Sequence, residues 1–489
     1  MGRAVSNKDV SFNKRALKSG TIFLFMQLLV KGLSFLTTPL YTRMLSTEQY
    51  GEIRVYESWV LMLAPVVALN LYRCADQVKF EFGEKKYYNS ISSIQTLAYI
   101  AMMVFSIILL SFHQYFEKIF DMSFPALILM TFFFFANASL EFMRRREKQM
   151  MNYKLNAITT FSTMIPATLL SLLLIYLGSI ANYKDALVFY RNLGFYLPQI
   201  IGGLVIAALI WRDGKKLVDF KVWKYAIVFC LPLIPEMISI QIMNQSDKLM
   251  IKYLVDLEST GIYSLATTVS WIVWVLADGV WNAWQPWLYE KISKNEIADV
   301  QKPWIGIMHA FGLLTWLLVA FAPELIYILG GNSYNDAIYL IAPLCLSVLY
   351  HFFNNSYSAI QSFYKKTTSV ATITVGAMLV NIVLNFVGIK WYGYQAAAYA
   401  TAFSYFLSML LQAIAGRRIV GREIIPLKKS VKICLFYLII CLSSMVLYRL
   451  STIVRYMIIL IVLVGLAVIF KEQIMTLIKK SNLFEKRKG

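Results

Sequence analysis

Long apolar stretches alternate with short polar turns along almost the whole chain of 489 residues. Each stretch is close to the ~20 residues that a membrane-spanning helix needs, and no ten-residue alternating strand pattern competes with them. The stretches lie near 17–39, 53–73, 90–112, 125–143, 155–178, 187–210, 225–246, 262–286, 303–321, 337–360, 367–388, 393–415, 431–448 and 454–470. The pattern therefore predicts an all-α integral membrane protein with about 14 transmembrane helices.

Charge alternates between the turns. Lysine and arginine concentrate in every second turn, for example in RRREKQ at 144–149, WRDGKK at 211–216 and RRIVGRE at 417–423. Because cytoplasmic loops of membrane proteins carry the excess of lysine and arginine, we expect these turns on the cytoplasmic side. Both termini then lie in the cytoplasm. The first 15 residues are polar and basic, so the sequence predicts no signal peptide.

Composition supports this class and excludes several functions. Hydrophobic residues make up 58% of the chain and charged residues only 15%, which one soluble core could not bury. The net charge of +20 is spread over short turns, so it indicates membrane orientation and not nucleic-acid binding. The five cysteines have no CxxC spacing, and we expect neither a disulfide framework nor a metal site.

The sequence also lacks the signatures of common enzymes. The three histidines form no HExxH motif, and neither GxSxG nor GxxxxGK[ST] occurs. The turns are too short for a soluble catalytic domain. A membrane enzyme such as a glycan polymerase or an acyltransferase would need a larger outer loop or a cluster of catalytic acids. We therefore expect no catalytic residue and no cofactor.

Two outer turns repeat a short pattern. LSTEQYG at 45–51 is similar to VDLESTG at 255–261, with Glu48 matching Glu258 and Gly51 matching Gly261. Six spans separate the two copies, so both halves begin on the same side of the membrane. Such parallel repeats are related by an axis along the membrane normal, as in several transporters.

Several motifs follow in a distinctive order: PLYTRMLSTEQYG at 39–51, LPLIPE at 231–236, NQSDK at 244–248, STGIYSLA at 259–266 and WQPWLYEK at 284–291. This order resembles the polysaccharide-transporter (oligosaccharide flippase) family. That family belongs to the superfamily that includes multidrug and toxin extrusion transporters and the lipid II flippase. The resemblance covers the chain up to about residue 415, and it rests on order and spacing because each motif alone is loose.

The resemblance implies two six-helix lobes around a central cavity, plus two C-terminal helices. Spans one, two, seven and eight would be the chief lining of the cavity. The expected divisions are a cytoplasmic arm at 1–16, an N-lobe at 17–215, a C-lobe at 216–415, two additional spans at 416–470 and a basic cytoplasmic tail at 471–489.

The resemblance further implies a flippase of the bacterial cytoplasmic (inner) membrane. Its substrate would be an undecaprenyl-diphosphate-linked oligosaccharide, moved by alternating access for capsule, O-antigen (lipopolysaccharide) or exopolysaccharide synthesis. Partners would be membrane lipids and the polysaccharide polymerase and glycosyltransferases of the same pathway. The alternative is a multidrug-extrusion-type cation antiporter, which shares the fold but exports small amphipathic cations.

Polar residues on span one share one helical face. Gln27, Lys31, Ser34 and Thr38 recur at i, i+4, i+7 and i+11. Lys31 lies roughly 12 Å of helix from the outer end, a depth at which a charge is costly. One interpretation is that Lys31 binds the substrate diphosphate, with Gln27 and Ser34 as further contacts. The other is a structural pair with an acid on a neighbouring helix.

Span eight combines aromatic and acidic residues on one face: Trp271, Trp274, Asp278, Trp281 and Gln285. Trp274 and Trp281 lie well inside the span, whereas tryptophans that only anchor a helix would lie at its ends. Aromatic surfaces with polar groups suit a cavity that binds sugars. The structural alternative is helix packing with an interfacial anchor.

Span seven carries Glu236 beside Pro232 and Pro235, with Asn244 nearer its outer end. An intramembrane acid is a functional hypothesis by default, and proline can break the helix and expose backbone carbonyls. We therefore name Glu236, Asp278 and Asn244 as candidates for coupling to protons or sodium. Glu236 could instead form a fixed pair with Lys31.

Other polar residues have more ordinary interpretations. Arg54 lies near an outer helix end and could attract a diphosphate. Asp247 and Lys248 at the outer mouth are expected to form a gate or a surface pair. Amides on spans ten and eleven, such as Asn354 and Asn385, predict interhelical hydrogen bonds.

Overall fold

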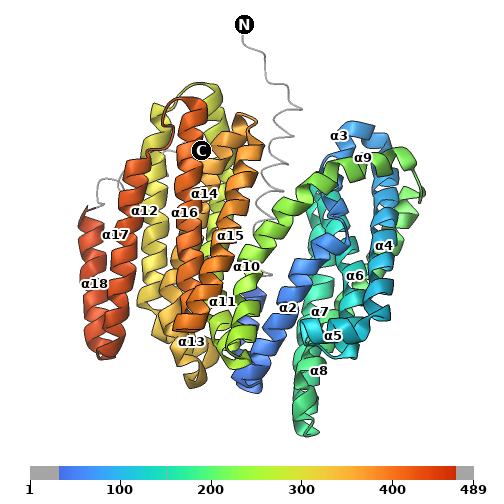
Figure 1. Ribbon diagram of the computed structural model, residues 1–489, viewed down its shortest axis with the longest axis horizontal. Coiled ribbons are helices and arrows are strands. Elements are labelled where there is room, and N and C mark those ends of the chain that lie inside the picture. Colours follow the sequence, from blue (N-terminus) through green and yellow to red (C-terminus); the bar gives the residue numbers. More distant parts are fainter. Residues whose placement is uncertain (1–31, 151, 470–489) are drawn as a thin grey trace, which may run out of the picture. The chain divides into compact units, whose positions relative to one another are not determined.

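The computed structural model describes residues 32–150 and 152–469, and every regular element in these ranges is helical. Residues 32–44 form a first helix. The helices that follow (Figure 1) are α2 Thr47–Val67, α3 Val78–Phe82, α4 Tyr87–Ser111, α5 His113–Phe120, α6 Phe124–Gln149, α7 Tyr153–Ile180, α8 Leu187–Gly214, α9 Phe220–Cys230, α10 Ile234–Leu254, α11 Leu257–Ser293, α12 Ala298–Ala320, α13 Ala322–Gly330, α14 Ile338–Phe363, α15 Thr367–Tyr392, α16 Gln395–Val420, α17 Leu427–Val446 and α18 Thr452–Ile469.

Most of these helices are suited to a membrane. Ten are long and apolar enough to cross it, and the bent pair α9–α10 makes eleven. The other predicted spans correspond to the helix at 32–44, to α2 and to α18. α2 is more polar because its first half contains Glu48, Glu52, Arg54 and Glu57. The prediction of an all-α, multi-pass integral membrane protein is confirmed.

The predicted seventh span is broken at its two prolines. Pro232 lies in the short 3-10 helix Leu231–Leu233, and Pro235 lies in the first turn of α10. Proline has no amide N–H and its ring clashes with the preceding turn, so it can kink or break a helix. The helix axes on the two sides of the break differ by 47°. This confirms the effect expected from the prolines.

The chain divides into two compact units, which we describe separately. Unit 1 contains the described residues up to Leu265, together with Leu329–Ser333 and Thr374–Ala400. Unit 2 contains Ala266–Ile328, Tyr334–Ile373 and the described residues from Thr401 onward. The lobe boundaries expected from the resemblance stay a prediction.

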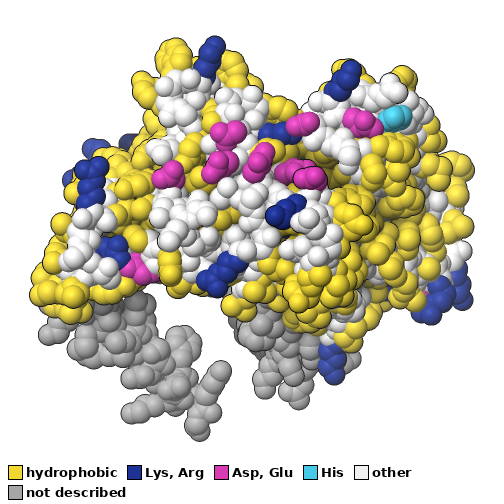
Figure 2. Space-filling model, turned by 90° about the horizontal axis from the view of Figure 1, so that it is seen from below, with side chains coloured by type: hydrophobic (Ala, Val, Ile, Leu, Met, Phe, Trp, Pro, Cys, Tyr) yellow, Lys and Arg dark blue, Asp and Glu magenta, His cyan; other side chains and the backbone are white. Residues whose placement is uncertain are grey.

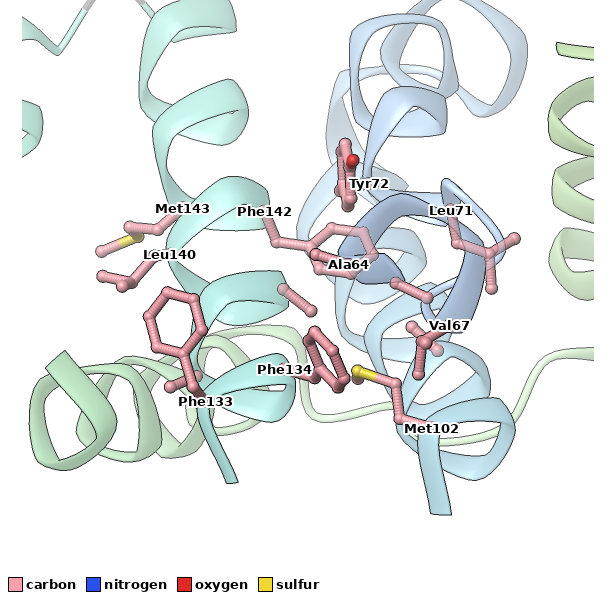
Figure 3. Close-up of a cluster of buried hydrophobic side chains, with 14 of the residues drawn as sticks. Ala64, Val67, Leu71, Tyr72, Met102, Phe133, Phe134, Leu140, Phe142 and Met143 are labelled. Atoms are coloured by element: carbon pink, nitrogen blue, oxygen red, sulfur yellow. The ribbon is translucent and has the colours of Figure 1, made fainter. Parts of the chain in front are cut away.

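Unit 1 has a hydrophobic core built from several helices (Figure 3). Phe134 of α6, Met102 of α4 and Val67 of α2 belong to one cluster of buried side chains. The ring of Phe142 meets Tyr72 edge-on, with 6.4 Å between centroids. Lipid is as apolar as these side chains, so close packing holds such helices together more than exclusion from water does.

In unit 2, α17 is joined to α12 by a ladder of hydrogen bonds. The indole N–H of Trp304 donates to Ser430 Oγ at 3.1 Å, and that of Trp316 donates to Ser444 Oγ at 2.9 Å. Between them, the hydroxyl of Tyr437 donates to a backbone carbonyl of α12 at 3.0 Å. The acceptors and donor on α17 are seven residues apart, so they share one face. α17 is therefore an integral part of unit 2.

Candidate functional site

A partly buried ion-pair cluster joins α2 and α8 in unit 1. The carboxylate of Glu57 accepts from Arg54 Nη1 at 2.7 Å and from Arg191 Nη2 at 2.7 Å. Arg54 also donates to the hydroxyl of Tyr50 at 2.5 Å. Only 5% of Arg191 is exposed. Two guanidinium groups share one carboxylate, so the cluster has an excess positive charge inside the helix bundle.

Both arginines of this cluster have a donor left over. Nε of Arg54 and Nε of Arg191 are buried and meet no hydrogen-bond acceptor among the described residues. A guanidinium presents five donors in a planar fork that matches the oxygens of a phosphate. The cluster therefore contains the type of donor that a phosphate group would need.

α10 brings a third cation to this cluster. Gln245 Oε1 lies 3.2 Å from Ser58 Oγ and accepts from Lys248 Nζ at 3.1 Å. Lys248 also interacts electrostatically with Arg54 and Glu57. The cationic cluster therefore extends from α8 across α2 to α10.

Asp247 lies in a second polar cluster of unit 1. Only 4% of Asp247 is exposed, and its carboxylate accepts from Tyr263 OH and from Asn385 Nδ2, each at 2.6 Å. Asn385 Nδ2 also donates to Asn381 Oδ1 at 3.2 Å. Asn385 Oδ1 is buried and meets no donor in the described part of the chain. Carboxylate and amide oxygens of this kind are ligands for hard cations.

The aromatic face predicted on span eight lines a narrow pocket in unit 2. Trp274, Asp278 and Trp281 of α11 line it together with residues of α14. The ring of His351 stacks on Trp274, with centroids 4.6 Å apart and planes 15° apart. Asn355 Nδ2 donates to His351 Nε2 at 3.1 Å. The pocket therefore offers flat rings beside hydrogen-bonding groups.

The residues predicted on span one are described only in part. Gln27 and Lys31 lie outside the described residues. Ser34 is exposed, and its backbone carbonyl accepts from the hydroxyls of Thr37 and Thr38. The role predicted for Lys31 therefore stays a prediction.

Other predicted residues are dispersed. Trp271 is 45% exposed, with its ring 5.9 Å from that of Trp274. Gln285 donates to the hydroxyl of Tyr289 at 3.3 Å. Asn244 is partly buried in α10, whereas the side chain of Glu236 lies outside the described part of the structure.

Sequence reasoning missed the two buried clusters of unit 1. Glu57 and Arg191 are far apart in the sequence, so no local spacing predicts their contact. The spacing of Arg54 and Glu57 at i, i+3 was the available signal. Of the two expectations for Asp247 and Lys248, the surface pair is wrong, because Asp247 is buried and bound to Tyr263 and Asn385. The gate stays a prediction. Interhelical bonds by the amides are confirmed, since Asn354 also accepts from Ser408.

The fold is shared with solved transporters. The lipid II flippase MurJ, in an inward closed conformation, matches 93% of this chain and 100% of its own with a TM-score of 0.69 at 15% identity. An inward-facing multidrug resistance MATE family transporter matches 83% of this chain and 98% of its own with a TM-score of 0.61 at 12% identity. At these identities, the likeness concerns the fold.

Sequence comparison places the chain in a family. "Lsg locus putative protein 1" of Haemophilus influenzae is 24% identical over 404 residues, which are 78% of this chain and 94% of that protein. The family profile described as "Polysaccharide biosynthesis protein" matches residues 16–291, more than half of the chain. The chain therefore belongs to the polysaccharide biosynthesis protein family.

Proposed function

We propose that the protein is a flippase that moves an undecaprenyl-diphosphate-linked oligosaccharide across the bacterial cytoplasmic membrane, for cell-surface polysaccharide biosynthesis. Family membership supports the pathway, and the fold shared with the lipid II flippase supports the type of transport. The observation that carries the proposal is the partly buried cluster of Arg54, Glu57 and Arg191. The transport involves no covalent chemistry and proceeds by alternating access.

The cationic cluster would recognise the diphosphate. Arg54 and Arg191 keep their Nε donors available while Glu57 holds both guanidinium groups in place. A phosphate that approaches the cluster gains charge-assisted hydrogen bonds, which are roughly twice as strong as neutral ones. Lys248 adds attraction, and the predicted contacts Gln27, Lys31 and Ser34 complete this part of the proposal.

The aromatic pocket of unit 2 would contact the sugars. Trp274 and Trp281 offer apolar faces, while Asp278 and Asn355 line the same pocket and accept or donate hydrogen bonds. Trp271 and Gln285 extend this face along α11. The pocket contains no cation among its described lining residues, so it suits the neutral part of the substrate better than the diphosphate.

Transport would be coupled to a cation gradient through acids within the membrane. Glu236, Asn244 and Asp278 remain candidates from the sequence, and Asp247 now joins them. Its carboxylate lies with the amides of Asn381 and Asn385 where water is scarce, so either a proton or sodium would change the local charge. Binding and release of that cation would then bias the conformational equilibrium.

Multidrug extrusion is the second candidate function. The fold shared with the MATE family transporter and the acid Asp278 in an aromatic pocket favour it. The excess positive charge around Arg54 and Arg191 argues against it, because a buried cationic cluster repels cationic drugs.

We expect partners on the cytoplasmic side among the glycosyltransferases and the polymerase of the pathway.

A reconstituted transport assay tests the proposal. Purified protein in liposomes is given a fluorescent undecaprenyl-diphosphate oligosaccharide, with and without a pH or sodium gradient. We expect gradient-stimulated translocation that falls at least about tenfold, or 1.4 kcal/mol, in Arg54→Ala. The matched control is Arg43→Ala, because Arg43 is exposed near the end of the preceding helix at 32–44.

The same liposomes distinguish the two candidate functions. If a cationic dye is expelled while no lipid-linked oligosaccharide moves, the protein is a drug exporter and not a flippase.

Trp274→Ala gives a second readout: loss of one ring contact, worth roughly 0.5–1.5 kcal/mol, should weaken glycan binding roughly 2- to 10-fold. Trp391→Ala is its control, since Trp391 is 71% exposed.

A further inference from the structure

α17 has two chemically different faces. One face packs into unit 2 through Ser430, Tyr437 and Ser444. The other face is exposed along the whole helix. Its first turns present lysines, and its later turns present large apolar side chains, of which Ile439 is 66% exposed and Val446 is 67% exposed.

The charged and apolar parts of this exposed face are aligned. Lys428, Lys432, Leu435 and Ile439 recur at i, i+4, i+7 and i+11, so they lie above one another on one side of the helix. All four are exposed, and Lys429 flanks them. One membrane leaflet has roughly 15 Å of hydrocarbon, or about ten residues of helix at 1.5 Å each. The exposed apolar side chains from Leu435 to Val446 extend over a rise of eleven residues along the helix, which is about one leaflet deep.

Within the described part of the chain, no acidic side chain forms an ion pair with Lys428, Lys429 or Lys432. Two arginines of the preceding turn are engaged: Arg417 pairs with Glu423 at 3.0 Å, and Arg422 donates to an asparagine side chain. The positive charge at the start of α17 is therefore not neutralised locally.

The basic end of α6 behaves differently. Its three consecutive arginines each pair with a carboxylate: Arg144 with Glu141, Arg145 with Asp76, and Arg146 with both Glu147 and Asp213. The positive charge at the end of α6 is thus neutralised within the protein. The lysines of α17 are available to a ligand from outside the chain.

We propose that this face of α17 binds an anionic phospholipid, whose phosphate group contacts Lys428, Lys429 and Lys432 while an acyl chain lies along Leu435 and Ile439. Clusters of lysine beside a membrane helix attract anionic headgroups. The apolar stripe that continues from the lysines favours a lipid over an acidic protein or a soluble anion. The site is distinct from that of the proposed cargo, and it does not depend on the proposed function.

Lipid binding at α17 would act on unit 2. Because α17 is hydrogen-bonded to α12 at several levels, a lipid held on its outer face is held against the rest of unit 2. The additional helices after residue 416 then have a role: they fix unit 2 to the anionic leaflet.

Fluorescence anisotropy tests this with the full-length protein in neutral detergent. The probes are fluorescent phosphatidylglycerol and phosphatidylcholine with identical acyl chains. We expect a preference for phosphatidylglycerol that falls roughly 100-fold in Lys428→Gln/Lys429→Gln/Lys432→Gln, because each lysine near an anionic headgroup contributes about fivefold. Lys365→Gln/Lys366→Gln is the matched control, since both lysines are exposed on another basic turn.

Several results would overturn the site on α17. They are equal binding of the two lipids, an unchanged preference in the triple variant, an equal loss in the control pair, or full competition by inorganic phosphate at the same concentration. If the triple variant does not fold, the wild-type protein still decides the matter. At about 1 M salt the screening length falls to about 3 Å, so a preference that persists there is not due to the lysines.

Discussion

Gly51 and Gly261 allow α2 and the first turns of α11 to cross at backbone contact. A Cβ atom on Gly51 would lie 2.0 Å from the carbonyl oxygen of Leu257, and one on Gly261 would lie 2.2 Å from that of Thr47. These are the two glycines that match in the repeated outer turns. The two copies of the repeated turn therefore meet at their matched glycines.

The first prediction concerns this crossing. Gly51→Ala or Gly261→Ala places a methyl group against backbone atoms that cannot rotate away, so the helices must separate. Overpacking of this kind costs about 1–3 kcal/mol. We expect a lower midpoint of thermal unfolding in detergent and slower translocation. Gly306→Ala is the control: nothing lies within 4 Å of its added Cβ, so an equal loss there would refute the argument.

The second prediction concerns the carboxylate shared by two arginines. Glu57→Gln leaves Arg54 and Arg191 close together without a neutralising charge. We expect a loss of unfolding free energy of roughly 2–4 kcal/mol, measured by chemical unfolding in mixed micelles. Adding Arg191→Met should recover part of the loss, because it removes the uncompensated charge.

A pair of the same spacing provides the control for Glu57. Arg144 and Glu141 also form an i, i+3 ion pair, but 43% of the Arg144 side chain is exposed. Exposed pairs contribute about 0–1 kcal/mol, so Glu141→Gln should change stability little. If Glu57→Gln lowers the free energy of unfolding no more than Glu141→Gln does, the ion-pair cluster does not stabilise unit 1.

The third prediction concerns Asp247. Asp247→Asn keeps the size of the side chain but removes the charge that Tyr263 and Asn385 stabilise. We expect translocation in liposomes to lose its response to a pH or sodium gradient, by roughly tenfold or 1.4 kcal/mol. Asp185→Asn, an exposed acid on another turn, should keep the response. An intact response in Asp247→Asn would return the coupling role to Glu236 or Asp278.

The fold could be predicted because each membrane-spanning helix can be recognised from its own stretch of sequence. Apolar stretches predict spans, and two prolines predict the 47° break between α9 and α10. Short helices were missed for the same reason: α5 and α13 are shorter than a span and carry no membrane-length signal. The face on α11 could also be predicted, because Trp274, Asp278 and Trp281 are related by helical spacing.

Contacts between distant helices could not be predicted. The meeting of Arg191 with Glu57, and of Asn385 with Asp247, depends on how α8 and α15 pack against α2 and α10. A single sequence gives no measure of that packing. Figure 2 shows several Asp and Glu side chains on the face seen from below. Glu48, Asp121 and Glu258 are exposed on turns predicted to face outward.

The last prediction concerns the bond between Trp316 and Ser444. Both residues are buried, and the indole N–H of Trp316 donates to Ser444 Oγ at 2.9 Å. Ser444→Ala removes the acceptor and leaves a buried donor, which costs about 1–3 kcal/mol. Ser443→Ala is the matched control, because the neighbouring Ser443 is exposed. Thermal unfolding in detergent should therefore separate the two variants. If both unfold at the wild-type temperature, hydrogen bonding does not hold α17 against α12, and the proposed lipid site could not anchor unit 2 through that helix.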